Sequence, residues 1–313
     1  MALGIAVAGV SCAASCAIAD APRFAYVTNQ GSETVSVVDL ETFKVTATIP
    51  VPGKPAGVAV SPVQDRVYVT CPDTHDVAVI DTKVNAVVVR WPAGKGPLGI
   101  AVQPVTGRVF VADWYGTFVR VLDPSGGNVL SEIAVGQSPS GIAISSDSTR
   151  ALTADRDSDT VSMFGATSGG PKSAVAVGGH PFGMTLSGDG RRAYTANVTS
   201  DDVSVIDVAA QAVVATIAVG RRPYAVALSQ TRAFVTDQYG GTVSVIDLAS
   251  LKKTNTIEAC DHPEGINYDA SRDVVYVACW FDNKLIRIDA ETLKITGSVA
   301  AGDGPRAFGD FIK

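Results

Sequence analysis

The sequence has few charged residues and no excess of positive charge. Of its 313 residues, 18% are Asp, Glu, Lys or Arg and 46% are hydrophobic. A long disordered chain is excluded, because disorder goes with few apolar residues and high net charge. Lys and Arg number 25 against 31 Asp and Glu, which gives a formal net charge of −6. This balance disfavours a uniformly basic nucleic-acid-binding protein, which neutralises phosphates with an excess of Lys and Arg.

The sequence also lacks the short motifs that identify common catalytic sites. It has no His-x-x-x-His pair, no nucleophile elbow and no phosphate-binding P-loop. No segment shows a sustained helical period, and beyond residues 2–19 no stretch is long and apolar enough to cross a bilayer. These absences favour a non-enzymatic, all-β protein, for which we predict no catalytic residues, no metal and no cofactor.

The first residues have the features of a processing segment. Residues 2–19 carry no charge and end in a small-x-small pattern at Ala19. This pattern predicts a signal peptide over residues 1–19 and a periplasmic or secreted domain over residues 20–313, with no stable membrane insertion after cleavage. No Lys or Arg precedes the apolar run, so an uncleaved anchor is one alternative, and a lipoprotein site at Cys12 or Cys16 is another.

A short apolar run recurs seven times along the chain. Each copy has Tyr, Phe or Leu first and Asn, Asp or Cys fourth, and the copies begin at Tyr26, Tyr68, Phe110, Leu152, Tyr194, Phe234 and Tyr276. Each unit contains four segments rich in Val, Ile, Thr and Tyr and bounded by Gly, Pro and Asp, as strands require. Four-stranded units of about 42 residues repeated seven times predict a seven-bladed β-propeller.

The two ends of the repeat array are complementary. The chain enters at the second strand of a unit, over residues 24–28. Residues 304–311 align with the innermost-strand segment of another unit, residues 54–60. We therefore expect the C-terminal strand to complete the first blade, which would remove two exposed strand edges.

The repeat resembles a known family. The sequence Tyr-Val-Thr-Asn at residues 26–29, the segment at residues 203–207 and the terminal segment at residues 304–312 are typical of the YVTN-repeat seven-bladed β-propellers, the YncE-like group. The resemblance covers residues 23–312. It implies the fold and, since members are commonly exported, an extracytoplasmic location. It implies no particular reaction, because the family shares a scaffold and not one activity.

Residues that depart from the repeat gather in two sets of loops. One set follows the second strand of each unit, and the other precedes each innermost strand; in a propeller both sets open on one face. The candidate binding residues in these loops are Trp114, Tyr115, His180, Phe182, Arg222, Tyr224, His262, Glu264, Trp280, Phe281 and Arg306. Turns do not require aromatic residues, so we predict a surface at the mouth of the central channel that binds a ligand or partner. The alternative for the aromatic residues is packing over the ends of the blades.

This surface suits more than one chemistry. Aromatic rings with interspersed Arg stack bases or sugars and hold anionic groups, so a single-stranded nucleic acid, a carbohydrate or an envelope protein fits it. The alternative function is a small-molecule hydrolase or lyase in which His180, His262 and Glu264 supply an acid–base pair or metal ligands. Their spacing matches no diagnostic motif. We expect a monomeric binding protein.

The cysteines add one structural prediction. After removal of the leader, Cys71, Cys260 and Cys279 remain. Cys260 precedes the seventh unit and Cys279 ends the second strand of that unit, so both lie at the same face. We predict a Cys260–Cys279 disulfide and a free Cys71. The alternative is a metal site formed by Cys260, Asp261 and His262 with Cys279.

Overall fold

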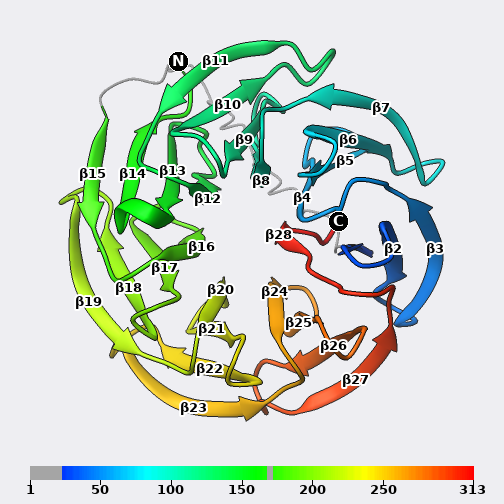
Figure 1. Ribbon diagram of the computed structural model, residues 1–313. Helices are drawn as coiled ribbons and strands as arrows, with labels where there is room; N and C mark the ends of the chain where they lie inside the picture. The colour runs from blue at the N-terminus through cyan, green and yellow to red at the C-terminus, as the bar shows by residue number, and fades with distance from the viewer. Residues whose placement is uncertain (1–22, 168–171) are drawn as a thin grey trace, which may run out of the picture.

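The computed structural model describes residues 23–167 and 172–313, which form seven β-sheets arranged around a central axis (Figure 1). The chain is therefore the all-β, seven-bladed propeller that the repeat predicts. The expected signal peptide and its cysteines lie outside the described residues. Within the described part of the chain, no helix is long and apolar enough to span a bilayer.

Each blade is a small antiparallel sheet whose strands follow one another in sequence from the axis outward. The first three blades contain β1 (Phe24–Asn29), β2 (Thr34–Asp39) and β3 (Lys44–Pro50); β4 (Gly57–Val60), β5 (Arg66–Cys71), β6 (Asp76–Asp81) and β7 (Ala86–Pro92); and β8 (Pro97–Val102), β9 (Val109–Asp113), β10 (Phe118–Leu122) and β11 (Val129–Ala134). The fourth and fifth contain β12 (Pro139–Ile144), β13 (Arg150–Asp155), the short 3-10 helix η1 (Arg156–Ser158), β14 (Thr160–Gly165) and β15 (Ser173–Ala176); and β16 (Pro181–Leu186), β17 (Arg192–Asn197), β18 (Asp202–Asp207) and β19 (Ala212–Ala218). The last two contain β20 (Pro223–Leu228), β21 (Arg232–Asp237), β22 (Thr242–Asp247) and β23 (Lys252–Glu258); and β24 (Pro263–Asp269), β25 (Val274–Cys279), β26 (Lys284–Asp289) and β27 (Ile295–Ala300).

Burial changes with distance from the axis. The second and third strands of each blade are covered on both faces by the neighbouring blades; in β17 the last five residues are all buried. These strands therefore carry Val, Ile, Ala and aromatic residues on both faces, together with buried Thr, Ser, Asn and Asp residues such as Thr195 and Asn197. The outermost strands alternate between covered and exposed positions, as in β19. The core consequently lies between adjacent blades.

The C-terminal segment closes the ring, as the sequence predicts. It runs antiparallel to β1, with bridges from Ala25 to Ile312 and from Asn29 to Pro305. Its short strand β28 (Phe308–Asp310) also pairs in parallel with β4 of the second blade. The last residues therefore complete the first blade and join it to the second, and β28 lies near the centre of the molecule (Figure 1).

The innermost strands pack closely against one another. A Cβ atom on Gly99 would lie 1.6 Å from the carbonyl oxygen of Ser140 in the next blade, so only glycine permits this approach. Threonine hydroxyl groups form hydrogen bonds between other neighbouring blades. Thr70 Oγ1 donates to the Leu98 carbonyl at 2.8 Å, and Thr236 Oγ1 donates to the Glu264 carbonyl at 2.7 Å. These contacts place the residue at the entrance of each innermost strand at a defined point around the channel.

Candidate functional site

A recurrent hydrogen bond brings the two predicted sets of loops to one face. The N–H of the residue after the second strand donates to the carbonyl of the residue before the proline of the innermost strand. The pairs are Trp114 to Gly96, Val198 to His180, Gln238 to Arg222 and Trp280 to His262, at 2.8–3.0 Å. We call the surface formed by these loops the loop face.

The residues that precede the prolines share one loop geometry. His180, Arg222 and His262 have φ angles of 51°, 52° and 53°. This left-handed conformation is uncommon outside glycine and is held here by the loop-to-loop hydrogen bonds. The residues two positions after these three are Phe182, Tyr224 and Glu264, and all of them are buried.

An aromatic plug fills the channel at the loop face. Phe182 and Tyr224 follow the prolines of β16 and β20, and Phe308 begins β28. The Phe182 ring centroid lies 4.6 Å from Tyr224 and 4.7 Å from Phe308, and Trp114 packs edge-on against Phe182 at 5.7 Å. Phe182, Tyr224 and Phe308 are buried. Of the predicted binding residues, Phe182 and Tyr224 therefore pack inside the molecule, which is the alternative that the sequence left open.

A polar network lies on the plug. Arg306 Nε donates to Tyr224 Oη at 2.7 Å and lies 3.5 Å from Glu264 Oε2. Gln238 Nε2 donates to Glu264 Oε1 at 2.5 Å. Burial raises the pKa of Glu264 above its usual value, against the opposing effect of the Arg306 charge. The Arg306 guanidinium also lies 5.8 Å from the ring centroid of Trp280, so three predicted site residues surround one arginine.

A row of exposed and half-buried side chains lies beside this network. The Arg222 guanidinium lies over Tyr239 at 5.5 Å, Tyr239 packs against His262 at 5.1 Å, and His262 packs against Phe281 at 4.5 Å. Tyr239 is 52% exposed and Phe281 is 60% exposed. We call Arg222, Tyr239, His262 and Phe281 the rim row.

Tyr239 is a site residue that was not among the candidates from the sequence. It is the second residue after β21, as Phe281 is after β25 and Tyr115 is after β9. That shared repeat position is the signal that identifies it. Tyr115 is 75% exposed and lies against Gly96. Its neighbour Trp114 links the plug to Arg156, whose guanidinium lies 5.2 Å from the Trp114 ring centroid.

His180 does not contact the other two residues of the alternative catalytic site. The His180 N–H donates to Asp159 at 2.7 Å, Glu264 belongs to the network on the plug, and His262 Nδ1 is hydrogen-bonded to Asp261 Oδ1 at 2.7 Å. No hydrogen bond, ion pair or ring contact in the described part of the chain joins His180 to either of the other two. Among the described residues, no group of three or more His, Cys, Asp or Glu could hold a metal ion.

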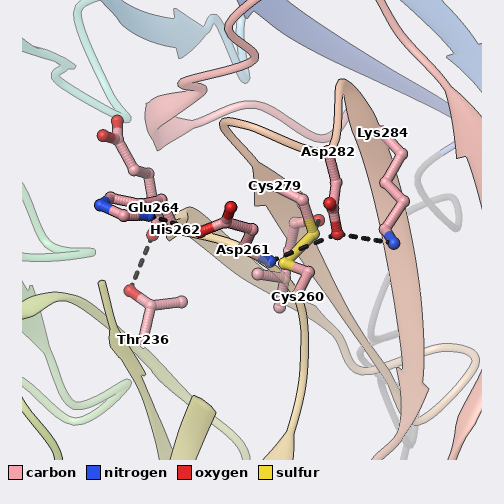
Figure 2. The surroundings of a disulfide bond; sticks show 9 residues. Thr236, Cys260, Asp261, His262, Glu264, Cys279, Asp282 and Lys284 are labelled. Carbon is pink, nitrogen blue, oxygen red and sulfur yellow. Dashed lines mark hydrogen bonds and ion pairs between the residues drawn. A yellow bond between two sulfur atoms is a disulfide. The ribbon is translucent and has the colours of Figure 1, made fainter. Parts of the chain in front are cut away.

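A disulfide supports the loop that carries His262. Cys260 and Cys279 are bonded, with their Cα atoms 5.9 Å apart. Neither sulfur is then available as a thiolate ligand for the alternative metal site. Figure 2 shows the disulfide beside Asp261, next to the Asp282–Lys284 ion pair of 2.8 Å.

The remaining described cysteine is separate from this loop. Cys71 is free and buried, and burial raises the pKa of its thiol to about 11. A thiol with such a pKa stays protonated at neutral pH and is a poor nucleophile.

The comparisons with known proteins agree with this architecture. A family model described as "YNCE-like beta-propeller" matches residues 4–108, a segment that includes strands β1 to β8. Over this segment the chain is similar to the YncE-like β-propellers. No curated protein matches the sequence.

Solved structures share the fold of this seven-bladed propeller at low sequence identity. A functionally unknown protein from Desulfotomaculum acetoxidans DSM 771 has a TM-score of 0.78 and 16% identity, over 92% of this chain and 100% of that chain. Hydrazine synthase from Kuenenia stuttgartiensis has a TM-score of 0.75 and 16% identity, over 91% and 100%. The dihydro-heme d1 dehydrogenase NirN in complex with DHE has a TM-score of 0.65 and 16% identity, over 95% and 76%. At this identity the likeness shows the fold alone.

Proposed function

We propose that this propeller is an exported, monomeric, non-enzymatic binding protein that holds its ligand on the loop face. The observation that carries the proposal is the rim row. Tyr239 and Phe281 are both more than half exposed, and neither a turn nor the core requires aromatic rings there. Large exposed aromatic side chains that gather on a loop surface are typical of binding sites.

The rim row is held in place before any ligand arrives. The Cys260–Cys279 bond fixes the loop that precedes His262, and the hydrogen bond from Trp280 N to the His262 carbonyl fixes the loop that precedes Phe281. A ring that is already ordered loses little conformational entropy on binding. The row therefore has the rigidity that a recognition surface needs.

The carboxylate beside the rim row favours a carbohydrate over a single-stranded nucleic acid, and the positive charge of Arg222 within the row is the opposing contribution. Asp261 accepts from His262 and its side chain is 60% exposed. Its carboxylate would repel phosphate groups, whereas it can accept hydrogen bonds from sugar hydroxyls. The net charge of −6 also repels phosphate groups. The exposed rings supply apolar faces for the sugar ring.

Binding to defined oligosaccharides tests this proposal. The purified protein is applied to an array of immobilised oligosaccharides, with fluorescein-labelled oligothymidylate as the nucleic-acid probe. Tyr239→Ala and Phe281→Ala should each lower binding at least tenfold while the melting temperature stays unchanged. Val105→Ala, which removes an exposed apolar side chain from a loop at the opposite face, is the control and should bind normally. Binding that both aromatic variants retain, or binding to oligothymidylate alone, would overturn the carbohydrate proposal.

The export proposal has separate support. A disulfide is typical of proteins from oxidising compartments, and residues 1–19 have a signal-peptide pattern. Thiol titration of the unreduced, denatured domain of residues 20–313 should detect Cys71 alone, and reduction should release Cys260 and Cys279. If all three thiols react before reduction of protein isolated from its native compartment, the export proposal loses its structural support.

A further inference from the structure

A second candidate site lies at the opposite end of the channel. A cavity of about 1470 Å³ opens between the far halves of the innermost strands. Strand β16 shows its position. The strand runs from Phe182 in the plug past Met184 to Leu186, and Ser187 follows it. Met184, Leu186 and Ser187 line the cavity. None of the plug residues lines it, so the cavity is closed toward the loop face by the plug.

The cavity wall is largely apolar. Met184 and Leu186 from β16, Leu228 from β20, and Val60 and Val102 from β4 and β8 line it and are each partly exposed. Apolar side chains from four different blades thus face one space that is open to water. Removing such a surface from water is favourable for a ligand with an apolar body.

The charged groups of the cavity leave one carboxylate without a partner. Arg23 lies 3.5 Å from Asp39, and Lys313 Nζ lies 3.6 Å from Asp65. In the lining, Asp189 accepts a hydrogen bond from Ser187 Oγ at 2.6 Å. Among the described residues, no hydrogen bond or ion pair reaches the carboxylate of the fourth charged lining residue, Asp310.

Asp310 occupies the inner part of the cavity. It lies in β28, two residues from Phe308 of the plug and three residues before Lys313, which lines the outer part. Its side chain is exposed and lines the cavity. A carboxylate that no neighbouring positive charge neutralises attracts a cation placed beside it.

We propose that this cavity binds an organic cation with an apolar body, with its amine or guanidinium group on Asp310 and its body against Met184, Leu186 and Leu228. An anionic ligand would meet the uncompensated carboxylate, since the two basic residues of the lining are paired with Asp39 and Asp65. The volume exceeds that of many small-molecule pockets, which occupy about 300–1,000 Å³. This site is separate from the rim row and does not depend on the function proposed for the loop face.

A pair of fluorescent probes tests the proposal on the full chain. Dansylcadaverine carries an apolar ring system and a primary amine, and dansylamide carries the same rings without the amine. Titration followed by dansyl fluorescence should show at least tenfold tighter binding of dansylcadaverine. Asp310→Asn, which keeps the side-chain shape, should lower the affinity for dansylcadaverine about tenfold and leave dansylamide unchanged.

Two further variants locate the binding. Leu186→Trp places a larger side chain in the cavity and should weaken both probes, whereas Tyr239→Ala on the loop face should weaken neither. Equal affinity for the two probes, a preference for the amine that Asp310→Asn retains, or no binding of either probe would overturn the proposal. Loss of probe binding in Tyr239→Ala would place the probes at the rim row and would overturn it as well.

Discussion

Arg306 and Glu264 lie 3.5 Å apart, Nε to Oε2, across the junction between the first and seventh blades. Arg306 belongs to the C-terminal segment that completes the first blade, and Glu264 lies at the start of β24. The ring of blades is therefore closed by backbone pairing to β1 and by an ionic contact above the plug. Because the Glu264 side chain is buried and that of Arg306 nearly so, the pair contributes to stability only while both members are present.

Removing one member of this pair should destabilise the propeller more than removing both. For Arg306→Met we expect a loss of about 2 kcal/mol in the free energy of unfolding, below the ~3–5 kcal/mol for a fully buried pair because Arg306 keeps some exposure. The double variant Arg306→Met with Glu264→Gln should recover part of the loss, because no buried charge is then left alone. Urea denaturation of the two variants and the parent measures this. A double variant less stable than Arg306→Met would show that the ionic contact is not the main interaction.

The buried carboxylate of Asp155 should make stability depend on pH. Burial raises its pKa from an ordinary 3.8 to about 6, although Ser162 and Thr160 donate hydrogen bonds to it. The folded state then holds a proton that the unfolded state has released, so this group's contribution is complete below about pH 4 and is lost as the pH rises through 6. The repeat has Asn at the equivalent position 197, where Nδ2 donates to Ser204 Oγ at 2.9 Å.

Asp155→Asn should remove that dependence. The free energy of unfolding of the variant relative to the parent should increase between pH 4 and 6, by up to ~3 kcal/mol, and should stay constant above pH 7. Chemical denaturation at several pH values measures the difference. Taking the difference cancels the carboxylates whose pKa is lowered, such as Asp39 and Asp147, because they are present in both proteins. A difference that does not change with pH would mean that Asp155 stays charged in the folded protein at little cost.

Aromatic residues from equivalent loops should respond differently to truncation. Phe182→Ala removes a buried ring from the plug and should cost ~3–5 kcal/mol. Phe281→Ala removes a ring that is 60% exposed and should change stability by about 0.5 kcal/mol or less. Thermal unfolding followed by circular dichroism separates the two. A large loss of stability in Phe281→Ala would assign the rim row to the scaffold and remove the main support for a binding surface there.

Deleting residues 305–313 should destabilise the whole ring and not the first blade alone. The deletion removes the strand that pairs with β1 and β4 and also removes Phe308 from the plug. We expect a single cooperative transition at a lower temperature, because every blade packs against two neighbours. A control that replaces only Lys313 with Ala keeps these strands and should melt close to the parent. A truncated protein that melts like the parent would show that the seventh and second blades hold the ring without the closing strand.

The repeat determined the propeller, its closure and the face on which the loops gather. Strand-forming runs at a spacing of 40 or 42 residues are local features, and the sequential hairpins of a blade need no distant information. The offset between residues 24–28 and residues 304–311 was enough to predict that the C-terminal strand completes the first blade. The shared position of Cys260 and Cys279 at one end of the seventh unit likewise followed from the repeat.

The tertiary structure alone decided which of the unusual side chains face the solvent. Phe182 and Phe281 are both aromatic residues in loops of the same face, yet Phe182 meets Tyr224 and Phe308 across the channel while Phe281 meets His262 at the edge. Residues from separate blades make these contacts, at distances along the chain that no local pattern encodes. The far cavity arises in the same way, because Asp310 and Leu186 face one space only after seven blades have closed into a ring.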